Sequence, residues 1–424
     1  MTPLERLFAL ERFGIKLGLD NIRAMLAALD NPERAWRSVH IAGTNGKGSV
    51  AAMVERGLRA SGLKTGRYTS PHLDVIEERV AINGEAVDRE TFTAATAVVF
   101  AAVDQATRAG TLTVVPTFFE VSTAVAFEIF RQAKVEVAVV EVGLGGRFDA
   151  TNVLTPEVAA ITSIAFDHER HLGTTLSQIA FEKAGIAKPG TPLVIGRLPD
   201  EAARCIATVA AAASAPLIDA PGATTGRSYP PLELALAGRH QLDNAAVAVA
   251  VLEAWSTRVS VVPTSAIVTG LTECEWPARL EWLQLADGGQ LLIDAAHNPA
   301  GATALATYLH DTNIAPLPVV LAVMEDKDLA GMLTPLIPVA SAFVTTTVPH
   351  TRARAAESLA RALQQLAPGL AVDAEPNPVA AVAKALSRSE RAVAAGSIYL
   401  IGPLRARLMK AGAARRRRGH STAP

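Results

Sequence analysis

A glycine-rich run with a lysine and a serine is the segment of this chain that most clearly predicts chemistry. Gly43-Thr44-Asn45-Gly46-Lys47-Gly48-Ser49 follows a short apolar stretch, 39–42, and precedes a helical pattern over 50–58. Glycines let backbone N–H groups approach an anion, and a helix N-terminus favours negative charge. Lys47 can then reach a terminal phosphate, and the Ser49 hydroxyl can face a magnesium ion. The run predicts a nucleotide phosphate site; the alternative is a glycine-rich turn with a surface lysine.

Three further polar residues follow predicted strands at their carboxyl ends. Glu141 ends an apolar run that starts at Val135, Ser70 follows the strand 65–69, and His168 follows the strand 158–164. Ligands of open parallel sheets bind outside the carboxyl ends of the strands. Glu141 is therefore placed to hold a metal beside the phosphates, although a structural cap is the alternative. His168 lies on the same rim, which favours a ligand over an isolated surface histidine.

Strand-like and helix-like segments alternate along the chain, which predicts an α/β fold with a largely parallel sheet. The predicted strands of the first part are Ser38–Ala42, Thr65–Thr69, Val135–Val142, Val158–Ile164 and Pro192–Ile195. The helices predicted between and after them are Val50–Ala60, Arg89–Ala109, Glu120–Gln132, Leu176–Ala187 and Asn244–Trp255. Residues 198–235 are rich in Pro, Gly and Ala and are not assigned from the pattern.

A second, smaller Rossmann-like sheet without its own phosphate loop is expected after Pro277. Its predicted strands are Gln290–Ile293, Pro318–Val323, Ala342–Thr346 and Ser397–Ile401. A chain of 424 residues exceeds one ordinary core. We therefore expect an ATP-binding domain over 1–276 and a C-terminal domain over 277–424.

Composition excludes several classes of function. The chain is 50% hydrophobic and 19% charged, and 40 Lys and Arg against 41 Asp and Glu give a net charge of −1. This argues against a nucleic-acid binder, and no apolar window is long enough to predict a membrane span. Two distant cysteines and an N-terminus without signal-peptide character favour a reducing, cytoplasmic location. The run Arg415–Arg418 is expected to be a solvated tail, with an acidic partner as the alternative.

The phosphate run departs from the common G-x-x-x-x-G-K-[ST] pattern, because Ile41 replaces the first glycine and Gly48 precedes the serine. In this form it resembles the ATP loop of the Mur ligase superfamily, in its folylpolyglutamate synthase and dihydrofolate synthase branch. Further blocks resemble that branch in its order and cover nearly the whole chain. They are 69–73, 117–120, 141–147, 149–152, 167–168, 182–186, 240–241 with Asn244, and Asp294 with 297–299.

The resemblance implies roles for residues that the pattern alone leaves open. Ser70, Glu141 and His168 match the positions that hold Mg²⁺ in this family. Lys183, by itself an exposed helix lysine, matches a lysine that the family carbamylates, and with Lys47 it completes the expected catalytic set. The ATP contacts it implies are Thr44, Asn45, Gly46, Lys47, Gly48, Ser49, Asn244, Arg279, Asp294 and His297. An Asp-x-x-His turn could instead be purely structural.

Substrate contacts follow from the same resemblance. Thr117, Phe119, Phe148, Asp149 and Ala150, with the segment 13–19, match regions that line the pterin site, although buried aromatics are normally core residues. Residues 198–235 would carry a small antiparallel sheet, as in relatives.

The reaction implied is ATP-dependent and Mg²⁺-dependent joining of L-glutamate to a folate carboxylate through an acyl phosphate, with closure of the two domains to exclude water. The block 117–120 and Asp149-Ala150 resemble the bifunctional bacterial enzymes, which implies dihydropteroate as a second acceptor; folate extension alone is the alternative. The rival functions are another Mur-type amino-acid ligase and a nucleotide-binding switch without ligase activity. We expect a monomer whose partners are small molecules, with no nucleic acid and no membrane.

Overall fold

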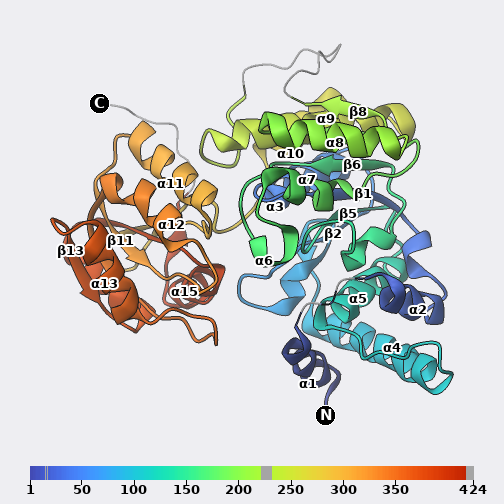
Figure 1. Ribbon diagram of the computed structural model, residues 1–424, viewed down its shortest axis with the longest axis horizontal. Helices are drawn as coiled ribbons and strands as arrows, with labels where there is room; N and C mark the ends of the chain where they lie inside the picture. Colours follow the sequence, from blue (N-terminus) through green and yellow to red (C-terminus); the bar gives the residue numbers. More distant parts are fainter. Residues whose placement is uncertain (15, 17, 221–231, 417–424) are drawn as a thin grey trace. The chain divides into compact units, whose positions relative to one another are not determined.

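The protein forms two compact units in a computed structural model that describes residues 1–14, 16, 18–220 and 232–416. The first unit comprises Met1–Ala235 and Gln241–Glu275, and the second comprises Leu236–His240 and Trp276–Pro424. Figure 1 colours the first unit blue to yellow and most of the second yellow to red. Each unit is built on one sheet with helices packed against it, so the α/β prediction is confirmed.

The first sheet has eight strands in the order β4-β3-β2-β5-β1-β6-β7-β8. Five neighbouring pairs, from β2 to β8, are parallel, whereas β3 and β4 form an antiparallel edge. The central strands are buried almost throughout, which is why they read as continuous apolar runs. The strands are β1 (Arg37–Ala42), β2 (Thr65–Tyr68), β3 (Val80–Ile82), β4 (Glu85–Ala86), β5 (Val137–Glu141), β6 (Val158–Ile161), β7 (Leu193–Ile195) and β8 (Leu217–Asp219).

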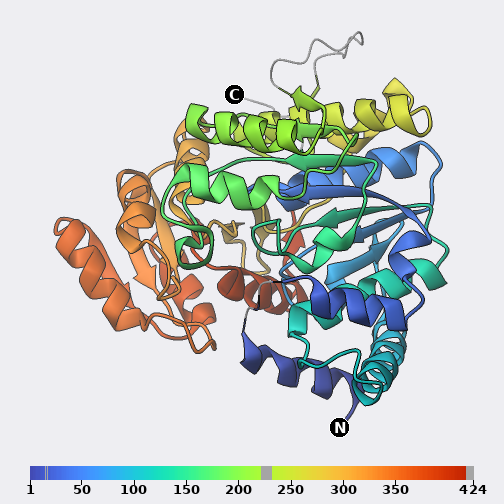
Figure 2. The same ribbon diagram turned by 45° about the vertical axis from the view of Figure 1, so that its right-hand side comes forward.

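Helices of the first unit cover this sheet, as Figure 2 shows. One core packs α1, α2, α4 and α5 against β2 and β5, and another packs α7 and α8 against β6 and β7. The helices are α1 (Pro3–Phe8), α2 (Asp20–Ala28), α3 (Lys47–Ala60), α4 (Arg89–Arg108), α5 (Phe118–Gln132), α6 (Glu169–Leu172), α7 (Leu176–Ala184), α8 (Asp200–Ala212), α9 (His240–Arg258) and α10 (Thr264–Thr272).

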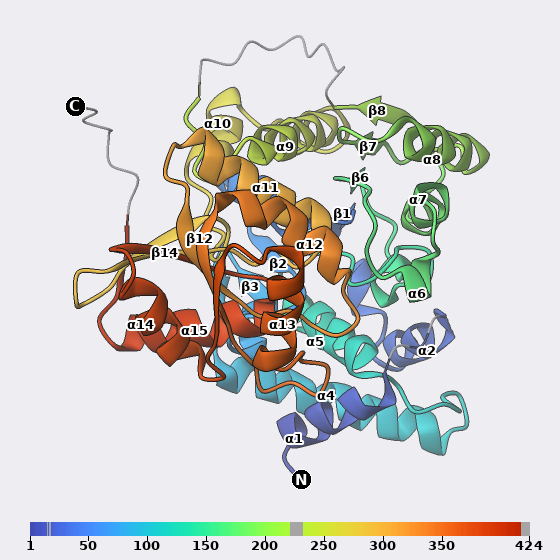
Figure 3. The same cartoon turned by 60° about the vertical axis from the view of Figure 1, so that its left-hand side comes forward.

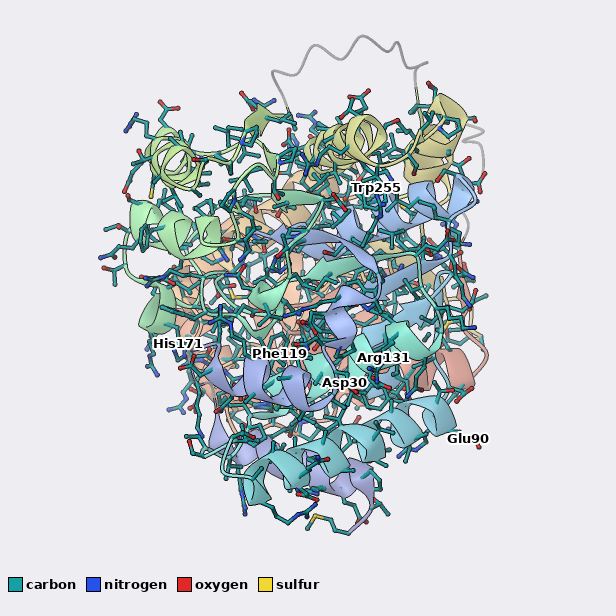
Figure 4. The ribbon with its side chains drawn as sticks, turned by 90° about the vertical axis from the view of Figure 1, so that its right-hand side faces the viewer. Asp30, Glu90, Phe119, Arg131, His171 and Trp255 are labelled. Carbon is teal, nitrogen blue, oxygen red and sulfur yellow. The ribbon has the colours of Figure 1, made fainter. Side chains whose placement is uncertain are left out.

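Aromatic packing fixes the position of α5 beneath the sheet. The Trp36 ring contacts Phe127 and Phe130 of α5 edge-on, with ring centroids 5.2 and 5.5 Å apart. Each such buried aromatic contributes about 1.5–3 kcal/mol by leaving water. The N-terminus of α5 is set by a capping box between Thr117 and Glu120, so the helix begins at Phe118. The cap thus fixes the start of α5, where Figure 4 labels Phe119, and the aromatic contacts hold its second half.

The second unit has a seven-stranded sheet in the order β13-β12-β11-β14-β10-β9-β15. Strand β9 pairs antiparallel with β10 on one side and with β15 on the other. Figure 3 shows β12 and β14 of this sheet with the helices α11 to α15. A core of α11, α12 and α13 residues packs against β11 and neighbouring strands. The strands are β9 (Glu281–Gln284), β10 (Gln290–Ile293), β11 (Leu317–Leu321), β12 (Ala340–Thr345), β13 (Ala371–Ala374), β14 (Arg391–Ala395) and β15 (Ala414–Arg415). The helices are α11 (Pro299–Asp311), α12 (Leu329–Leu336), α13 (Ala356–Leu366), α14 (Pro378–Leu386) and α15 (Ile398–Lys410).

Short 3-10 helices complete the two units, and the one that bears on the site is η4 (Ala150–Val153). The others are η1 (Ala9–Phe13), η2 (Pro32–Arg34), η3 (Ile76–Arg79) and η5 (Ile337–Val339). No helix in the described part of the chain combines the length and the apolar character that a membrane span needs.

Three sequence-based expectations are wrong in detail. Ser397–Ile401 is not a strand: the Ser397 side chain accepts from the Tyr399 N–H and starts α15, while the last parallel strand is β14. The described part of 198–235 holds helix α8 and strand β8, which is parallel to β7, rather than an antiparallel sheet. Arg415 is not in a solvated tail, because it lies in β15, 3.8 Å from Glu281. Residues 15 and 17 of the segment 13–19, residues 221–231 of 198–235, and residues 417–424 lie outside the described residues.

Candidate active site

The predicted phosphate loop joins β1 to α3, and its glycines are required by close packing. Gly46 caps α3 with a φ of 87°, and a Cβ there would lie 2.2 Å from Asn244 Oδ1. Gly43 has a φ of 145°, and its Cβ would lie 2.0 Å from Thr162 Oγ1. Only glycine fits both the left-handed backbone and the space. The helix therefore starts at Lys47, three residues before the predicted start, and its free N–H groups face the loop.

The loop that follows β6 holds the phosphate loop in shape. Thr162 and Ser163 both donate their hydroxyls to the Asn45 carbonyl, at 2.6 and 2.9 Å. The Asn45 N–H donates to Ser163 Oγ at 3.0 Å, and the Thr44 N–H donates to the Ser163 carbonyl at 2.8 Å. These bonds preorganise the loop, so that binding an anion costs little ordering.

Two lysine side chains meet at the carbonyl oxygen of Gly43. Lys183 Nζ, at the end of α7, donates to it at 2.9 Å, and Lys47 Nζ donates to it at 3.1 Å. Lys47 Nζ also donates to the Thr44 carbonyl at 3.2 Å and lies 3.9 Å from Glu141 Oε1. The structure thus brings Lys47, Lys183 and Glu141, which are far apart in sequence, to one point at the carboxyl ends of β1 and β5.

The environment of Lys183 changes its protonation. Burial, followed by the nearby charge of Lys47, lowers the pKa of Lys183 from its usual 10.5 to about 7, and Asp167 and Asp149 oppose the shift. A substantial fraction of the amine is therefore neutral near pH 7 and can act as a nucleophile.

Of the three predicted metal ligands, two lie in direct contact with each other. Glu141 is buried, and its Oε2 accepts from the Ser70 N–H at 3.2 Å, so these two residues adjoin. His168 caps the short helix α6 in a left-handed conformation, with φ 52°, and its side chain is 39% exposed. The described residues contain no group of three or more His, Cys, Asp or Glu side chains arranged for a metal.

This donor set nevertheless fits magnesium better than a metal that needs a full protein cage. Magnesium usually keeps several waters and is held by one or two carboxylates together with substrate phosphates. Glu141 provides such a carboxylate 3.9 Å from the phosphate-loop lysine. A left-handed residue other than glycine is uncommon, and such strain at a rim is consistent with a functional role for His168.

The Ser49 hydroxyl lies in a buried polar chain with two residues of α9. Gln241 Nε2 donates to Ser49 Oγ at 3.4 Å, and Asn244 Nδ2 donates to Gln241 Oε1 at 2.9 Å. Asn244 also lies against Gly46, as described above. These hydrogen bonds place Asn244, a predicted nucleotide residue, at the phosphate loop and add Gln241, to which the sequence assigned no individual role.

The predicted substrate residues are largely occupied by contacts of their own. Thr117 caps α5, and Phe119 packs on Gly143, where a Cβ would lie 2.4 Å from its ring. Asp149 is buried and accepts from the Leu144 N–H at 2.8 Å and from the Thr151 N–H at 3.0 Å. Ala150 is buried, whereas Phe148 is 37% exposed under the Arg147 guanidinium. Phe148 is thus the most exposed of these five residues, and Phe119 is partly buried.

The predicted nucleotide residues of the second unit lie at the start of its sheet. Asp294 follows β10 and accepts from the N–H groups of Leu280 and Ala296, both at 2.8 Å. His297 Nδ1 lies 2.9 Å from the Ala295 carbonyl. Arg279 stands between Ala278 and Leu280, which both have left-handed backbones. Asp294 therefore holds the turn that carries Arg279.

Asp167 lies near the site, although the sequence pattern 167–168 suggested a role for His168 alone. Its side chain is largely buried, and its charge acts on Lys183. The signal in the sequence was its position beside His168 after a predicted strand, but burial of the carboxylate is a property that only the fold reveals.

Comparison with known proteins identifies the family. The family model described as Mur ligase, glutamate ligase domain, matches residues 278–402. The dihydrofolate synthase/folylpolyglutamate synthase of Mycobacterium tuberculosis is 39% identical over 378 residues, which cover 81% of this chain and 77% of that protein. The Bacillus subtilis protein of the same name is 33% identical, over 94% of this chain and 96% of its own.

The chain belongs to the dihydrofolate synthase/folylpolyglutamate synthase family of Mur ligases. A crystal structure of the M. tuberculosis folylpolyglutamate synthase with ADP and AMPPCP has a TM-score of 0.86 and 35% identity, over 96% of this chain and 98% of that one. A bifunctional folylpolyglutamate synthase/dihydrofolate synthase with Mn, AMPPNP and L-glutamate has a TM-score of 0.84 and 31% identity, over 96% and 98%. The predictions of the family and of an ATP-dependent glutamate ligase are confirmed. The roles of individual site residues stay predictions.

Proposed function

We propose that this member of the dihydrofolate synthase/folylpolyglutamate synthase family joins L-glutamate to two acceptors, dihydropteroate and reduced folates. The observation that carries the proposal is the meeting of Lys47 and Lys183 at the Gly43 carbonyl, with Glu141 Oε1 3.9 Å from Lys47. Phosphoryl transfer needs positioned cations around the transferred group, and this cluster provides them beside a helix N-terminus. A nucleotide switch would need no second buried lysine with a lowered pKa.

The reaction proceeds in two steps, phosphoryl transfer and amide formation. A carboxylate oxygen of the acceptor attacks the γ-phosphorus of ATP, the bond to the β–γ bridging oxygen breaks, and an acyl phosphate and ADP form. The amine of glutamate then attacks the acyl carbon, loses a proton, and expels inorganic phosphate to leave an amide. Lys47 neutralises charge on the phosphates, and the N–H groups at the start of α3 bind them. The partly exposed Phe148 ring, which lies under the Arg147 guanidinium, is a candidate contact for an aromatic acceptor.

We propose Ser70, Glu141 and His168 as the residues that hold a divalent metal. When bound, the ion would neutralise phosphate charge and orient the transferred group. The solved structure with Mn and AMPPNP, at 31% identity, supports a metal in this family.

We further propose that Lys183 is carbamylated. The ammonium group first loses a proton, and the neutral amine then adds to the carbon of CO₂ and releases a second proton, so that the side chain changes from a cation to an anion. A pKa of about 7 supports this, because the reaction needs the free base. The anion would relieve the repulsion between Lys183 and Lys47.

The deciding experiment offers each acceptor separately to the purified protein with ATP, magnesium and labelled L-glutamate. Glutamate incorporation into both dihydropteroate and tetrahydrofolate is expected, with one phosphate released per amide. Product from tetrahydrofolate alone would remove the first activity and leave folate extension. Phosphate release that needs neither acceptor nor glutamate would contradict the ligase proposal.

A further inference from the structure

A histidine that has no part in the reaction above is buried beneath the site. His40 lies in β1, is fully buried, and has its Nε2 2.8 Å from Thr151 Oγ1. Its Nδ1 is also buried and has no hydrogen-bond partner among the described residues. Burial, with the nearby charge of Lys188, lowers the pKa of His40 to about 3, so the ring stays neutral. Burying a polar ring costs free energy of folding, and the hydrogen bond at Nε2 offsets part of that cost.

The contacts of Thr151 decide which way that bond runs. Thr151 Oγ1 lies 2.5 Å from Asp149 Oδ1, and the carboxylate also accepts the N–H groups of Leu144 and Thr151. These N–H donors favour the ionised carboxylate, although burial itself raises the pKa of Asp149. The single hydroxyl hydrogen of Thr151 therefore points to Asp149, and its oxygen accepts from His40 Nε2–H. The reverse order would leave a buried N–H at Nδ1 without an acceptor, which is rare.

Asp149 in turn holds together the loop 143–152, which follows Glu141 and contacts the end of α7 that carries Lys183. Its carboxylate bridges Leu144, three residues after Glu141, to Thr151 in η4. Within the loop, the Arg147 N–H donates to the Glu182 carbonyl at 2.8 Å, and Asn152 Nδ2 donates to the Gly185 carbonyl at 3.0 Å. The loop thus leaves the end of β5, where Glu141 lies, and packs on the end of α7, where Lys183 lies.

We propose that His40 is a positioning residue for the ligase. Its Nε2–H holds the Thr151 hydroxyl toward Asp149, and this relay keeps the loop 143–152 in the shape that places Glu141 and Lys183. The expected effect of the relay on kcat rests on the proposed function, whereas the positions of the hydrogens on His40 and Thr151 do not depend on it.

The hydrogen positions can be measured without any assay. In ¹⁵N-histidine-labelled protein, the signal of His40 among the nine histidines is assigned by its loss in His40→Gln. We expect the neutral tautomer with hydrogen on Nε2 throughout pH 6 to 9. Hydrogen on Nδ1, or a protonated ring in this range, would overturn the relay.

Kinetics then test what the relay does. His40→Gln keeps an amide N–H that can reach the position of Nε2, whereas His40→Met fills the space without a donor. We expect kcat to fall about tenfold or more in His40→Met and to stay within about threefold of wild type in His40→Gln. Equal losses in both variants, or a fully active His40→Met, would overturn the proposal.

A second pair covers the case in which His40→Met fails to fold. Thr151→Ser keeps the hydroxyl, and Thr151→Val removes it at nearly constant volume, so only Thr151→Val should lose kcat. Equal activity of the two would count against the relay. The wild-type assay reports separately on the proposed function: an inactive wild type would contradict that function, while the tautomer would still decide the relay.

Discussion

Lys47 and Lys183 donate to the same acceptor, the carbonyl oxygen of Gly43, at 3.1 and 2.9 Å. Two ammonium groups on one oxygen repel each other, and burial of Lys183 removes the water that would screen them. Burial, and then this repulsion, disfavours the charged form of Lys183, so the positive charge beside the phosphate loop rests mainly on Lys47. The pair therefore links the reactivity of one lysine to the anion affinity of the other.

Loss of the Lys47 charge should abolish turnover without unfolding the protein. Lys47 is 16% exposed, and its bonds are to loop carbonyls rather than to the core. In Lys47→Ala we expect the loss of at least about 3 kcal/mol of transition-state stabilisation, which is a fall in kcat/KM of about 100-fold or more. The check is the rate of phosphate release by Lys47→Ala compared with that of the control Lys64→Ala. Lys64 is an exposed lysine directly before β2. Turnover of Lys47→Ala near that of Lys64→Ala would reject the assignment.

The lowered pKa of Lys183 should make folding stability depend on pH. Between pH 7 and 10.5 the unfolded chain keeps this lysine protonated while the folded chain holds it largely neutral, so unfolding takes up a proton. Stability should therefore rise with pH in this window, by at most about 1.4 kcal/mol per pH unit from this group, and level off above it. Urea unfolding from pH 7 to 10 in CO₂-free buffer should show this rise in wild type relative to Lys183→Met. Parallel curves for the two proteins would contradict the lowered pKa.

Carbamylation of Lys183 predicts a chemical rescue. Lys183→Ala should lose activity, because no anion remains beside the phosphate loop, and added acetate should restore part of it by occupying the vacated space. Lys183→Arg should stay inactive, since it keeps the positive charge and cannot take up CO₂. Initial rates with 0 to 100 mM acetate, against chloride at equal ionic strength, measure the effect. An active Lys183→Arg enzyme would exclude the carbamate.

The phosphate loop and the rim could be predicted from the sequence because their signals are local. Gly43, Gly46 and Gly48 fall within six consecutive residues, and Glu141 ends its own strand. The relay of His40, Thr151 and Asp149 could not, since His40 and Thr151 are 111 residues apart and no local pattern pairs them. The same holds for Gln241, whose contact with Ser49 spans 192 residues.

The error at Ser397–Ile401 has a different cause. A short apolar run fits a buried strand and the first turn of a buried helix equally well, and periodicity cannot separate them. The Ser397 side chain caps the helix in the structure, and a serine at the start of an apolar run is compatible with either element. Similarly, the sequence does not reveal that the Asp149 carboxylate accepts the N–H groups of Leu144 and Thr151, because these bonds depend on the folded shape of the loop.

If Glu141 and His168 share one metal ion, their substitutions should not be additive. Glu141→Ala and His168→Ala should each raise the magnesium concentration for half-maximal rate or abolish activity, and the double variant should be little worse than the poorer single one. His171→Ala is the matched control, because His171 is exposed in the same short helix α6 (Figure 4). Rates over a magnesium titration measure the coupling. Strictly additive losses would assign the two residues to separate sites.

The loop 143–152 should act on Lys183 through close backbone packing, which a single methyl group can test. A Cβ at Gly146 would lie 2.8 Å from the Lys183 carbonyl oxygen and 2.9 Å from that of Glu182. Both neighbours are backbone atoms, so the loop or the end of α7 must shift, at a cost of about 1–3 kcal/mol. Because Lys183 Nζ is held only 2.9 Å from the Gly43 carbonyl, such a shift should displace the amine from the phosphate loop.

Gly146→Ala should therefore lose more activity than stability explains, with kcat down at least tenfold in protein that is still folded at the assay temperature. Gly369→Ala is the control, since the exposed Gly369 has no heavy atom within 4 Å of its added Cβ and should behave as wild type. Thermal unfolding and kcat of the two variants, measured side by side, separate the effects. Wild-type kcat in Gly146→Ala would show that the position of α7 is not transmitted through this contact, and Lys183 would then have to be placed by its own bond to Gly43 alone.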